Sequence, residues 1–229
     1  MAKKKEQKKE ILESPEALAD KLHLAEGWIE QHAKLVIGIV AVVLLAIGGY
    51  FGYRYYVTAQ DEEAQRQMFQ AVYYFEADSL DLALNGDGNN PGLIDIADEY
   101  GMTDAGNLAS FYAGASYLKQ GKYELARLYL EDFRAKDLLI QAKAYSLIGD
   151  SYMEEENFEQ AANYYNKAAS YEPNKFYTPT YLMKEALAYE KLNDPEKAKQ
   201  AYQTIIDNYW ESAEFQNARK FKAKLDGNP

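Results

Sequence analysis

The chain has 229 residues, no cysteine and a formal net charge of −11 at pH 7. Without cysteine it offers no disulfide, no thiolate nucleophile and no cysteine-based zinc site. From residue 55 onward 17 basic side chains face 29 acidic ones, and this negative charge argues against nucleic acid as a partner because it repels the phosphate backbone.

Residues 1–34 are expected to be a cytoplasmic leader, in which seven lysines and seven acidic residues cancel. Ser14 as the N-cap and Pro15 at the first helical position predict the start of an amphipathic helix. Its apolar residues recur at helical spacing: Leu18, Leu22, Ala25 and Ile29. This stripe fits a membrane surface or a partner helix, and its modest apolar content fits a frayed segment equally well.

Residues 35–53 contain no charged side chain and predict a transmembrane helix. The run LVIGIVAVVLLAIGGYFGY rises about 28 Å as a helix, which matches the core of a bilayer. A buried soluble helix is rarely apolar on every face over such a length. A cleaved signal peptide needs small residues after the apolar run, whereas the bulky YFGYRYY follows here. We therefore expect an uncleaved anchor.

The basic residues around the anchor predict its orientation. Seven lysines precede the span, and only Arg54 and Arg66 follow it within about 20 residues. Since cytoplasmic flanks carry the excess of basic side chains, the N-terminus should be cytoplasmic and the C-terminal domain translocated.

Glycines within the span indicate an alternative role. Gly48 and Gly52 form a GxxxG pair, and Gly38 and Gly49 add further small surface. Glycines at this spacing let two membrane helices pack closely. The chain would then be a structural subunit of a larger membrane complex that forms a homodimer through its anchor, without direct client binding. Glycine is common in membrane helices, so the pattern alone does not decide between the roles.

A small residue, an aromatic residue three positions on and an alanine nine further on recur four times after the span. The copies are Ala71, Tyr74, Ala83; Gly114, Tyr117, Ala126; Gly149, Tyr152, Ala161; and Ala186, Tyr189, Ala198. Small residues at these positions let two antiparallel helices approach closely. Residues 107–209 therefore predict three helical hairpins, with turns at residues 120–122, 156–157 and 193–195.

The segments beside the hairpins are less regular. Residues 54–106 are expected to be a degenerate first repeat with a loop insertion at 85–92, and residues 210–229 a capping helix and tail. Oxygen-bearing side chains stand near four positions of a calcium loop: Asp87, Asn89, Asp95 and Asp98. Pro91 occupies a ligand position, however, and Asp98 is shorter than the glutamate that normally closes such a site. We expect a plain loop without a metal.

The third copy resembles the tetratricopeptide repeat position by position. The matching residues are Tyr145, Ile148, Gly149, Tyr152, Ala161, Tyr165, Ala168 and Pro173. The expected fold is all-α, with one transmembrane helix, a superhelix of such repeats and a C-terminal capping helix. The anchor and the repeats together resemble bacterial single-span tetratricopeptide proteins of the ancillary Sec translocon subunit type. That resemblance implies an inner-membrane helper whose periplasmic domain contacts translocated or envelope proteins.

The predicted binding surface is the inward face of the superhelix, formed by the first helix of each hairpin. Its expected residues are Phe111, Ala115, Asp150, Met153, Met183 and Leu187. An apolar strip with acidic flanks suits an extended polypeptide segment that carries apolar and basic side chains. Packing between repeats is the alternative for Phe111, Met153 and Met183, because such stripes are usually core.

An enzyme is the competing class of function. Both histidines, His23 and His32, precede the span, so the C-terminal domain offers neither histidine nor cysteine as base, nucleophile or zinc ligand. A carboxylate-only enzyme would need two facing buried carboxylates in a deep pocket. We expect no catalysis and no cofactor. The expected role is a membrane-tethered, chaperone-like scaffold or adaptor, whose client the sequence does not identify.

Overall fold

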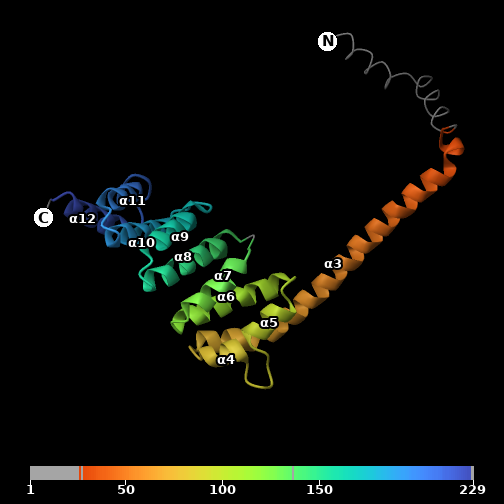
Figure 1. The fold of residues 1–229 in the computed structure, drawn as a ribbon, viewed down its shortest axis with the longest axis horizontal. Helices are drawn as coiled ribbons and strands as arrows, with labels where there is room; N and C mark the ends of the chain where they lie inside the picture. The colour runs from red at the N-terminus through yellow and green to blue at the C-terminus, as the bar shows by residue number, and fades with distance from the viewer. Residues whose placement is uncertain (1–25, 27, 136, 228–229) are drawn as a thin grey trace, which may run out of the picture. The chain divides into compact units, whose positions relative to one another are not determined.

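The computed structural model describes residues 26, 28–135 and 137–227. These residues form helices joined by turns and loops, with no strand among them, so the expectation of an all-α fold is confirmed (Figure 1). The chain divides into two compact units, Met1–Tyr56 and Val57–Pro229. The amphipathic helix expected to begin at Ser14 and Pro15 lies outside the described residues.

The apolar run lies in α3 (Ala33–Glu76), a helix of 44 residues. An 18-residue window of this helix has a mean hydropathy of 2.5, and none of that window is buried. Its large side chains are exposed, including Leu45 at 75%. A helix that is apolar on all sides without being buried has the composition of a membrane span. The helix is therefore long and apolar enough to cross a bilayer.

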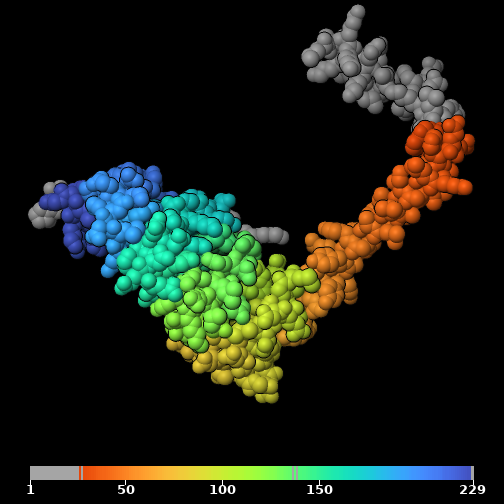
Figure 2. Space-filling view, in the orientation of Figure 1, coloured from red at the N-terminus to blue at the C-terminus, as the bar shows by residue number. Residues whose placement is uncertain are grey.

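Three antiparallel helical hairpins make up most of the second unit. They are α6 (Asp104–Lys119) with α7 (Tyr123–Asp132), α8 (Leu138–Glu154) with α9 (Phe158–Ser170), and α10 (Thr178–Lys191) with α11 (Pro195–Asn208). The shorter α12 (Phe215–Leu225) packs on α11 and ends the stack. Figure 2 shows these helices as one continuous body that runs from green to blue.

The small residues of the repeated pattern lie where the helices of a hairpin approach most closely. A Cβ atom at Gly114 would lie 2.6 Å from Leu130 Cγ and 3.0 Å from the backbone oxygen of Ala126. At Gly149 a Cβ would lie 2.6 Å from the ring of Tyr165. Such distances are shorter than van der Waals contact, so only glycine fits without a shift. The steric reason for the pattern is visible in these contacts.

The four turns that follow the repeat tyrosines share one geometry. The fourth residue after each tyrosine has a positive φ: Asp78, Gly121, Glu156 and Asn193, at 57°, 73°, 59° and 56°. The residue after it donates its backbone N–H to the tyrosine carbonyl, as Asn157 does to Tyr152 at 2.9 Å. This hydrogen bond satisfies one of the carbonyls that a helix leaves open at its C-terminus. The left-handed residue thereby ends each helix at the same point of the repeat.

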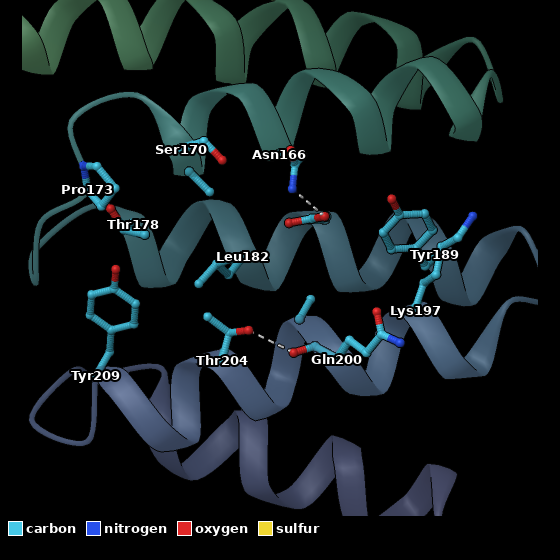
Figure 3. A pocket seen from close by; sticks show the side chains of 13 residues that line it. Asn166, Ser170, Pro173, Thr178, Leu182, Tyr189, Lys197, Gln200, Thr204 and Tyr209 are labelled. Atoms are coloured by element: carbon cyan, nitrogen blue, oxygen red, sulfur yellow. Dashed lines mark hydrogen bonds between the residues drawn. The ribbon is translucent and has the colours of Figure 1, made fainter.

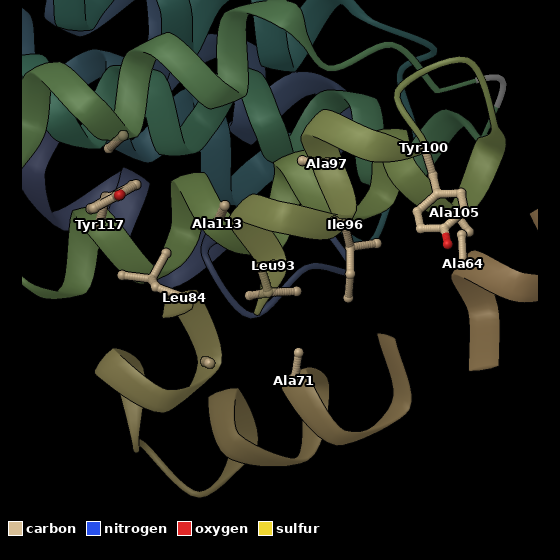
Figure 4. Close-up of a cluster of buried hydrophobic side chains, with 13 residues drawn as sticks. Ala64, Ala71, Leu84, Leu93, Ile96, Ala97, Tyr100, Ala105, Ala113 and Tyr117 are labelled. Carbon is tan, nitrogen blue, oxygen red and sulfur yellow. The ribbon is translucent and has the colours of Figure 1, made fainter. Parts of the chain in front are cut away.

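The first repeat is interrupted but shares the same core. The last turns of α3 pack with α4 (Leu80–Asn85), α5 (Leu93–Glu99) and α6 around one buried cluster (Figure 4). That cluster includes Ala64, Ala71, Leu84, Leu93, Ile96, Ala105 and Ala113. Asp61 Oδ1 accepts the backbone N–H of Ala105 at 2.8 Å, which caps the first turn of α6 from another helix. These contacts join residues 57–76 of α3 to the hairpins.

The loop of residues 86–92 is organised by Asp87. Its Oδ1 accepts the backbone N–H groups of Asn90 at 2.7 Å and Asn89 at 2.8 Å, and its Oδ2 accepts from the Asn90 side chain at 2.9 Å and the Tyr74 hydroxyl at 2.8 Å. These hydrogen bonds, those from Asn90 first, hold the pKa of Asp87 well below its ordinary value. Both carboxylate oxygens are thus engaged within the loop. No group of three or more metal-ligating side chains occurs in the described part of the chain.

Candidate protein-binding surface

One side of the repeat unit is formed by residues 57–76 of α3 together with α6, α8 and α10, which are the first helices of the successive repeats. We call this side the first-helix surface. It contains two hollows. An upstream groove lies between α3 and α6, and a downstream pocket lies between α6, α8 and the start of α10.

The upstream groove is an apolar hollow of about 580 Å³. One wall is a single face of α3, whose residues follow a spacing of three, one, three, one and three: Gln65, Met68, Phe69, Val72, Tyr73 and Glu76. The other wall belongs to α6 and includes Asp104, Leu108 and Tyr112. Phe69 is 76% exposed and Tyr73 is 59% exposed. Exposed aromatic side chains beside a hollow are typical of a surface that binds another polypeptide.

The downstream pocket is smaller, at about 350 Å³, and its charge is opposite. Apolar side chains of α6, α8 and the segment before α10 line it, among them Phe111, Leu139 and Tyr177. Its charged lining residues are Lys143 and Lys184, and no acidic residue is among the described residues that line it. The upstream groove, by contrast, is lined by the acidic Glu76 and Asp104.

A half-buried polar network holds Lys184 in place in the wall of the pocket. Its Nζ lies 2.7 Å and 2.8 Å from the two carboxylate oxygens of Asp150, and 3.3 Å from Ser146 Oγ. Asp150 also accepts the Tyr165 hydroxyl at 2.7 Å. Burial, followed by the nearby charge of Asp150, raises the pKa of Tyr165 well above its ordinary value, so this hydroxyl stays protonated and continues to donate. Asp150 therefore orients a lysine instead of facing a ligand directly.

Two neighbouring aromatic residues separate the hollows. Phe111 lines the downstream pocket, whereas Tyr112 lines the upstream groove. Their ring centroids are 5.7 Å apart in an edge-to-face arrangement. Phe111 also contacts Phe133 at 5.3 Å, and Tyr112 contacts Phe75 at 5.1 Å, so both rings are held by packing on their far sides. A chain that lies along the surface would cross this aromatic ridge.

The six residues predicted for the binding surface have different surroundings in the structure. Phe111 lines the downstream pocket, and Asp150 supports it through Lys184. Ala115 is buried, while Met153 and Met183 are half-buried and pack against two different core clusters. Leu187 is 45% exposed and lines neither hollow.

Several lining residues have no counterpart in the sequence prediction. On α3 these are Phe69 and Tyr73, and near the downstream pocket they are Leu139, Tyr177 and Lys184. A signal for the first pair was present, because residues 65–76 show an uninterrupted helical stripe. The residues of the downstream pocket come from three separate helices, and nothing in their spacing along the chain joins them.

Gly48 and Gly52 lie on the apolar part of α3. A Cβ atom at either position would meet no other heavy atom within 4 Å. These glycines therefore have no packing role within their own unit, in contrast to Gly114 and Gly149. A small, open helix face of this kind is available to a neighbouring membrane helix.

Few acidic side chains are buried in the part of the chain that the structure describes. Glu185 is the one buried acidic residue among those that the structure describes. The pair of facing buried carboxylates that a carboxylate-dependent hydrolase would require is therefore not formed by the described residues.

A comparison with known protein families supports the assignment of the hairpins as helical repeats. A family model described as a tetratricopeptide repeat-like domain matches residues 26–227, which include the whole of α3 and all the helices that follow. A search of curated proteins found no match.

Proposed function

The chain belongs to the tetratricopeptide repeat-like domain family, and from that premise we propose that it is a membrane-tethered scaffold that binds extended segments of other proteins on its first-helix surface. Repeat domains of this family are generally non-catalytic scaffolds for protein interaction. We place it in the bacterial inner membrane, with its N-terminus in the cytoplasm and its repeat unit in the periplasm. Its clients would be proteins in translocation or envelope assembly, with the Sec translocon as one candidate machine.

The observation that carries this proposal is the pair of hollows along the first helices, with exposed Phe69 and Tyr73 beside one and Tyr177 beside the other. Exposed aromatic residues cost hydration free energy when they remain unpartnered, and they bind with little loss of conformational entropy because they have few rotatable bonds. A polypeptide segment that covers both hollows would bury these rings. Two shallow contacts of this kind favour reversible binding without strict sequence specificity.

The charges of the two hollows predict the orientation of a bound client segment. Glu76 and Asp104 line the upstream groove, so a basic side chain is favoured there. Lys143 lines the downstream pocket, so an acidic or neutral side chain is favoured at that end. The expectation of an apolar surface with acidic flanks therefore applies to the upstream half alone.

Client binding is tested by photo-crosslinking with the full chain in membranes. A photoreactive residue in place of Val72 or Leu139 should capture the same client proteins, because both positions line the first-helix surface. Replacing Phe69 and Tyr73 by serine should reduce capture at both positions, while Trp210→Ser, which removes an exposed aromatic residue elsewhere, should not. Equal capture by the Phe69→Ser, Tyr73→Ser variant would mean that clients bind elsewhere.

Topology is tested by cysteine labelling, since the natural chain contains no cysteine. A cysteine in place of the exposed Asn208 should react with a membrane-impermeant maleimide added to spheroplasts, whereas Ala2→Cys should react only after the membrane is opened. Reversed labelling would contradict both the orientation and the periplasmic assignment.

The second candidate role is a structural subunit that dimerises through the anchor. The open helix face at Gly48 and Gly52 favours it. In that case crosslinking between two copies would depend on these glycines, while client capture would not depend on Phe69 or Tyr73. The two roles are thus distinguished by which substitutions have an effect. A dimeric subunit loses crosslinking between copies when Gly48 and Gly52 are replaced, and a client-binding scaffold loses client capture when Phe69 and Tyr73 are replaced.

A further inference from the structure

A cavity of about 600 Å³ lies on the other side of α10 from the downstream pocket, between α9 and α11 (Figure 3). Its apolar walls include Ala169, Leu182 and Ala201, and tyrosines mark its two ends, Tyr209 at one and Tyr189 at the other. The size is typical of a pocket that accepts a small molecule or a large side chain. Nothing in the first-helix surface uses this cavity.

A buried carboxyl group forms part of the cavity wall. Glu185 is only 5% exposed, and its Oε1 accepts a hydrogen bond from Asn166 Nδ2 at 3.0 Å, drawn as a dashed line in Figure 3. Its other oxygen, Oε2, has no hydrogen-bond partner among the described residues. An unpaired buried polar oxygen destabilises the folded state, so a ligand that donates to it is favoured. Rotation about the terminal bond of a glutamate side chain is soft, so Oε2 turns easily to a ligand in the cavity.

The one cationic side chain among the described residues that line the cavity is already paired. This residue is Lys197, and its Nζ lies 3.3 Å from Asp194 Oδ2 and 5.2 Å from the centre of the Tyr189 ring. The hydroxyl of Thr204 donates to the backbone oxygen of Gln200 at 2.9 Å. Glu185 forms no ion pair with any of the described residues, and its one hydrogen-bond partner among them is the neutral Asn166.

The chemistry of this wall selects an organic cation over a metal ion. A hard metal ion favours several carboxylate ligands at once, whereas the lining offers one carboxyl group, among amide, hydroxyl and apolar side chains and one lysine. A guanidinium or ammonium group pairs with a single carboxylate, and the apolar stem that carries it packs against alanine and leucine. We propose that this cavity binds a guanidinium or ammonium group on an apolar stem, with Glu185 as its acceptor.

This inference does not rest on the proposed function, because it concerns another side of α10 and none of the residues of the two hollows. The ligand group is either an arginine or lysine side chain of a partner protein or a free organic cation, since both present the same chemistry. In either case occupation of the cavity would bring together α9, α10 and α11, which its walls already join.

The test uses the full chain in detergent micelles and butylguanidinium as the probe, with uncharged butylurea as its isostere. Calorimetry should detect binding of butylguanidinium and none of butylurea. Glu185→Gln keeps an acceptor for Asn166 but removes the charge, and it should weaken binding by at least about tenfold. The matched control, Glu159→Gln, removes an exposed acidic group from the start of α9 and should bind the probe normally. Equal binding by Glu185→Gln would overturn the proposal.

A second variant keeps the test independent of any folding defect. Ser170→Trp introduces a bulky ring at an exposed lining position without touching Glu185, and it should also abolish binding. Unchanged affinity in Ser170→Trp would place the probe outside this cavity. Far-ultraviolet circular dichroism should give the same helical content for all variants.

The pH dependence provides a further readout. Burial raises the pKa of Glu185 above its ordinary value, so affinity should fall as pH is lowered through that raised value and should not change there in Glu185→Gln. The other charged or titratable groups facing the site are Tyr189, Lys197 with its partner Asp194, and Tyr209, and the lining residues of α9 do not titrate. A pH profile that persists in Glu185→Gln would contradict the assignment.

Competition by a peptide distinguishes a partner's side chain from a free organic cation as the natural ligand. An acetylated Ala-Arg-Ala amide that competes with butylguanidinium, while its citrulline counterpart does not, identifies a partner's side chain. Binding of butylguanidinium alone identifies a free organic cation. If neither compound binds, the proposal is wrong.

Discussion

Glycines have different roles in the two units of this chain. In the apolar part of α3, Gly48 and Gly52 have open space where a Cβ would be, and the large residues around them are exposed. In the repeat unit, Gly114 and Gly149 face Leu130 and Tyr165 at distances that leave no room for a Cβ. The described parts of both units are helical and rich in apolar residues, so composition alone does not reveal which glycines fix the packing. The difference lies in whether a second helix of the same unit covers the residue.

Enlarging Gly149 should have the largest effect on stability. Gly149→Leu forces the Tyr165 ring or the whole of α9 to move, and overpacking of this kind costs about 1–3 kcal/mol of unfolding free energy. Urea denaturation of the full chain in detergent, followed by circular dichroism, measures the loss. An unchanged transition midpoint would mean that α9 moves away freely and that the close approach does not matter for stability.

Removing the hydroxyl of Tyr165 should have a smaller effect in the same place. Tyr165→Phe keeps the ring that faces Gly149 but deletes the hydrogen bond to Asp150, which is 2.7 Å long. A hydrogen bond to a charged group contributes about 1.5 kcal/mol. The loss should appear in the urea midpoint, and in an Asp150→Ala background Tyr165→Phe should cost much less. Additive losses in the double variant would argue against this bond.

Relieving the strained turn at Glu156 should stabilise the repeat unit slightly. Its φ of 59° is left-handed, a conformation that glycine adopts without a steric penalty. Glu156→Gly should therefore raise the unfolding free energy by about 0.5–1 kcal/mol. Gly121 occupies the equivalent turn with a φ of 73°, and Gly121→Glu should lower stability by a similar amount. Opposite signs in this matched pair are the expected result of thermal melting.

Enlarging the glycines of the span should have the smallest effect on unfolding. Gly48→Leu with Gly52→Leu should change the urea midpoint of the repeat unit by less than about 0.5 kcal/mol, because nothing lies within 4 Å of either position. The same variant should reduce crosslinking between two copies if the anchor dimerises. Crosslinking yields that remain unchanged would exclude this face as the dimer interface, and a destabilised repeat unit would mean that these glycines do fix packing within the chain.

Much of the fold could be read from the sequence because its signals are local. The apolar run of residues 35–53 needs only length and composition, and the offset between Gly149 and Ala161 follows from the geometry of one hairpin. The turns at Gly121 and Asn193 contain residues that tolerate a positive φ, so the sequence indicates their conformation. Glutamate does not favour a positive φ, so the left-handed conformation of Glu156 is visible only in the structure.

The residues that line the two hollows were harder to predict because first helices are covered on two sides. Each packs against its own partner and against the helix that precedes it in the chain, so Met153 and Met183 lie on apolar stripes that the neighbouring helices cover in part. Helical spacing identifies such stripes but not which neighbour covers them. The pairing of Lys184 with Asp150 joins residues 34 positions apart, and it depends on how two hairpins stack. Local patterns carry no information on that stacking.

The common turn geometry also bears on how a domain of this kind changes in length. From Tyr117 to Tyr152 the repeat advances by 35 residues and from Tyr152 to Tyr189 by 37, whereas from Tyr74 to Tyr117 it advances by 43, an excess over the first of 43 − 35 = 8 residues. The loop of residues 86–92 accounts for most of that excess, outside the helices and outside the turn. Each hairpin contacts mainly its neighbours in a stack of this type. Duplication or loss of one repeat during evolution would then leave the contacts between the remaining repeats intact. The number of repeats would set the length of the polypeptide segment that the domain can hold.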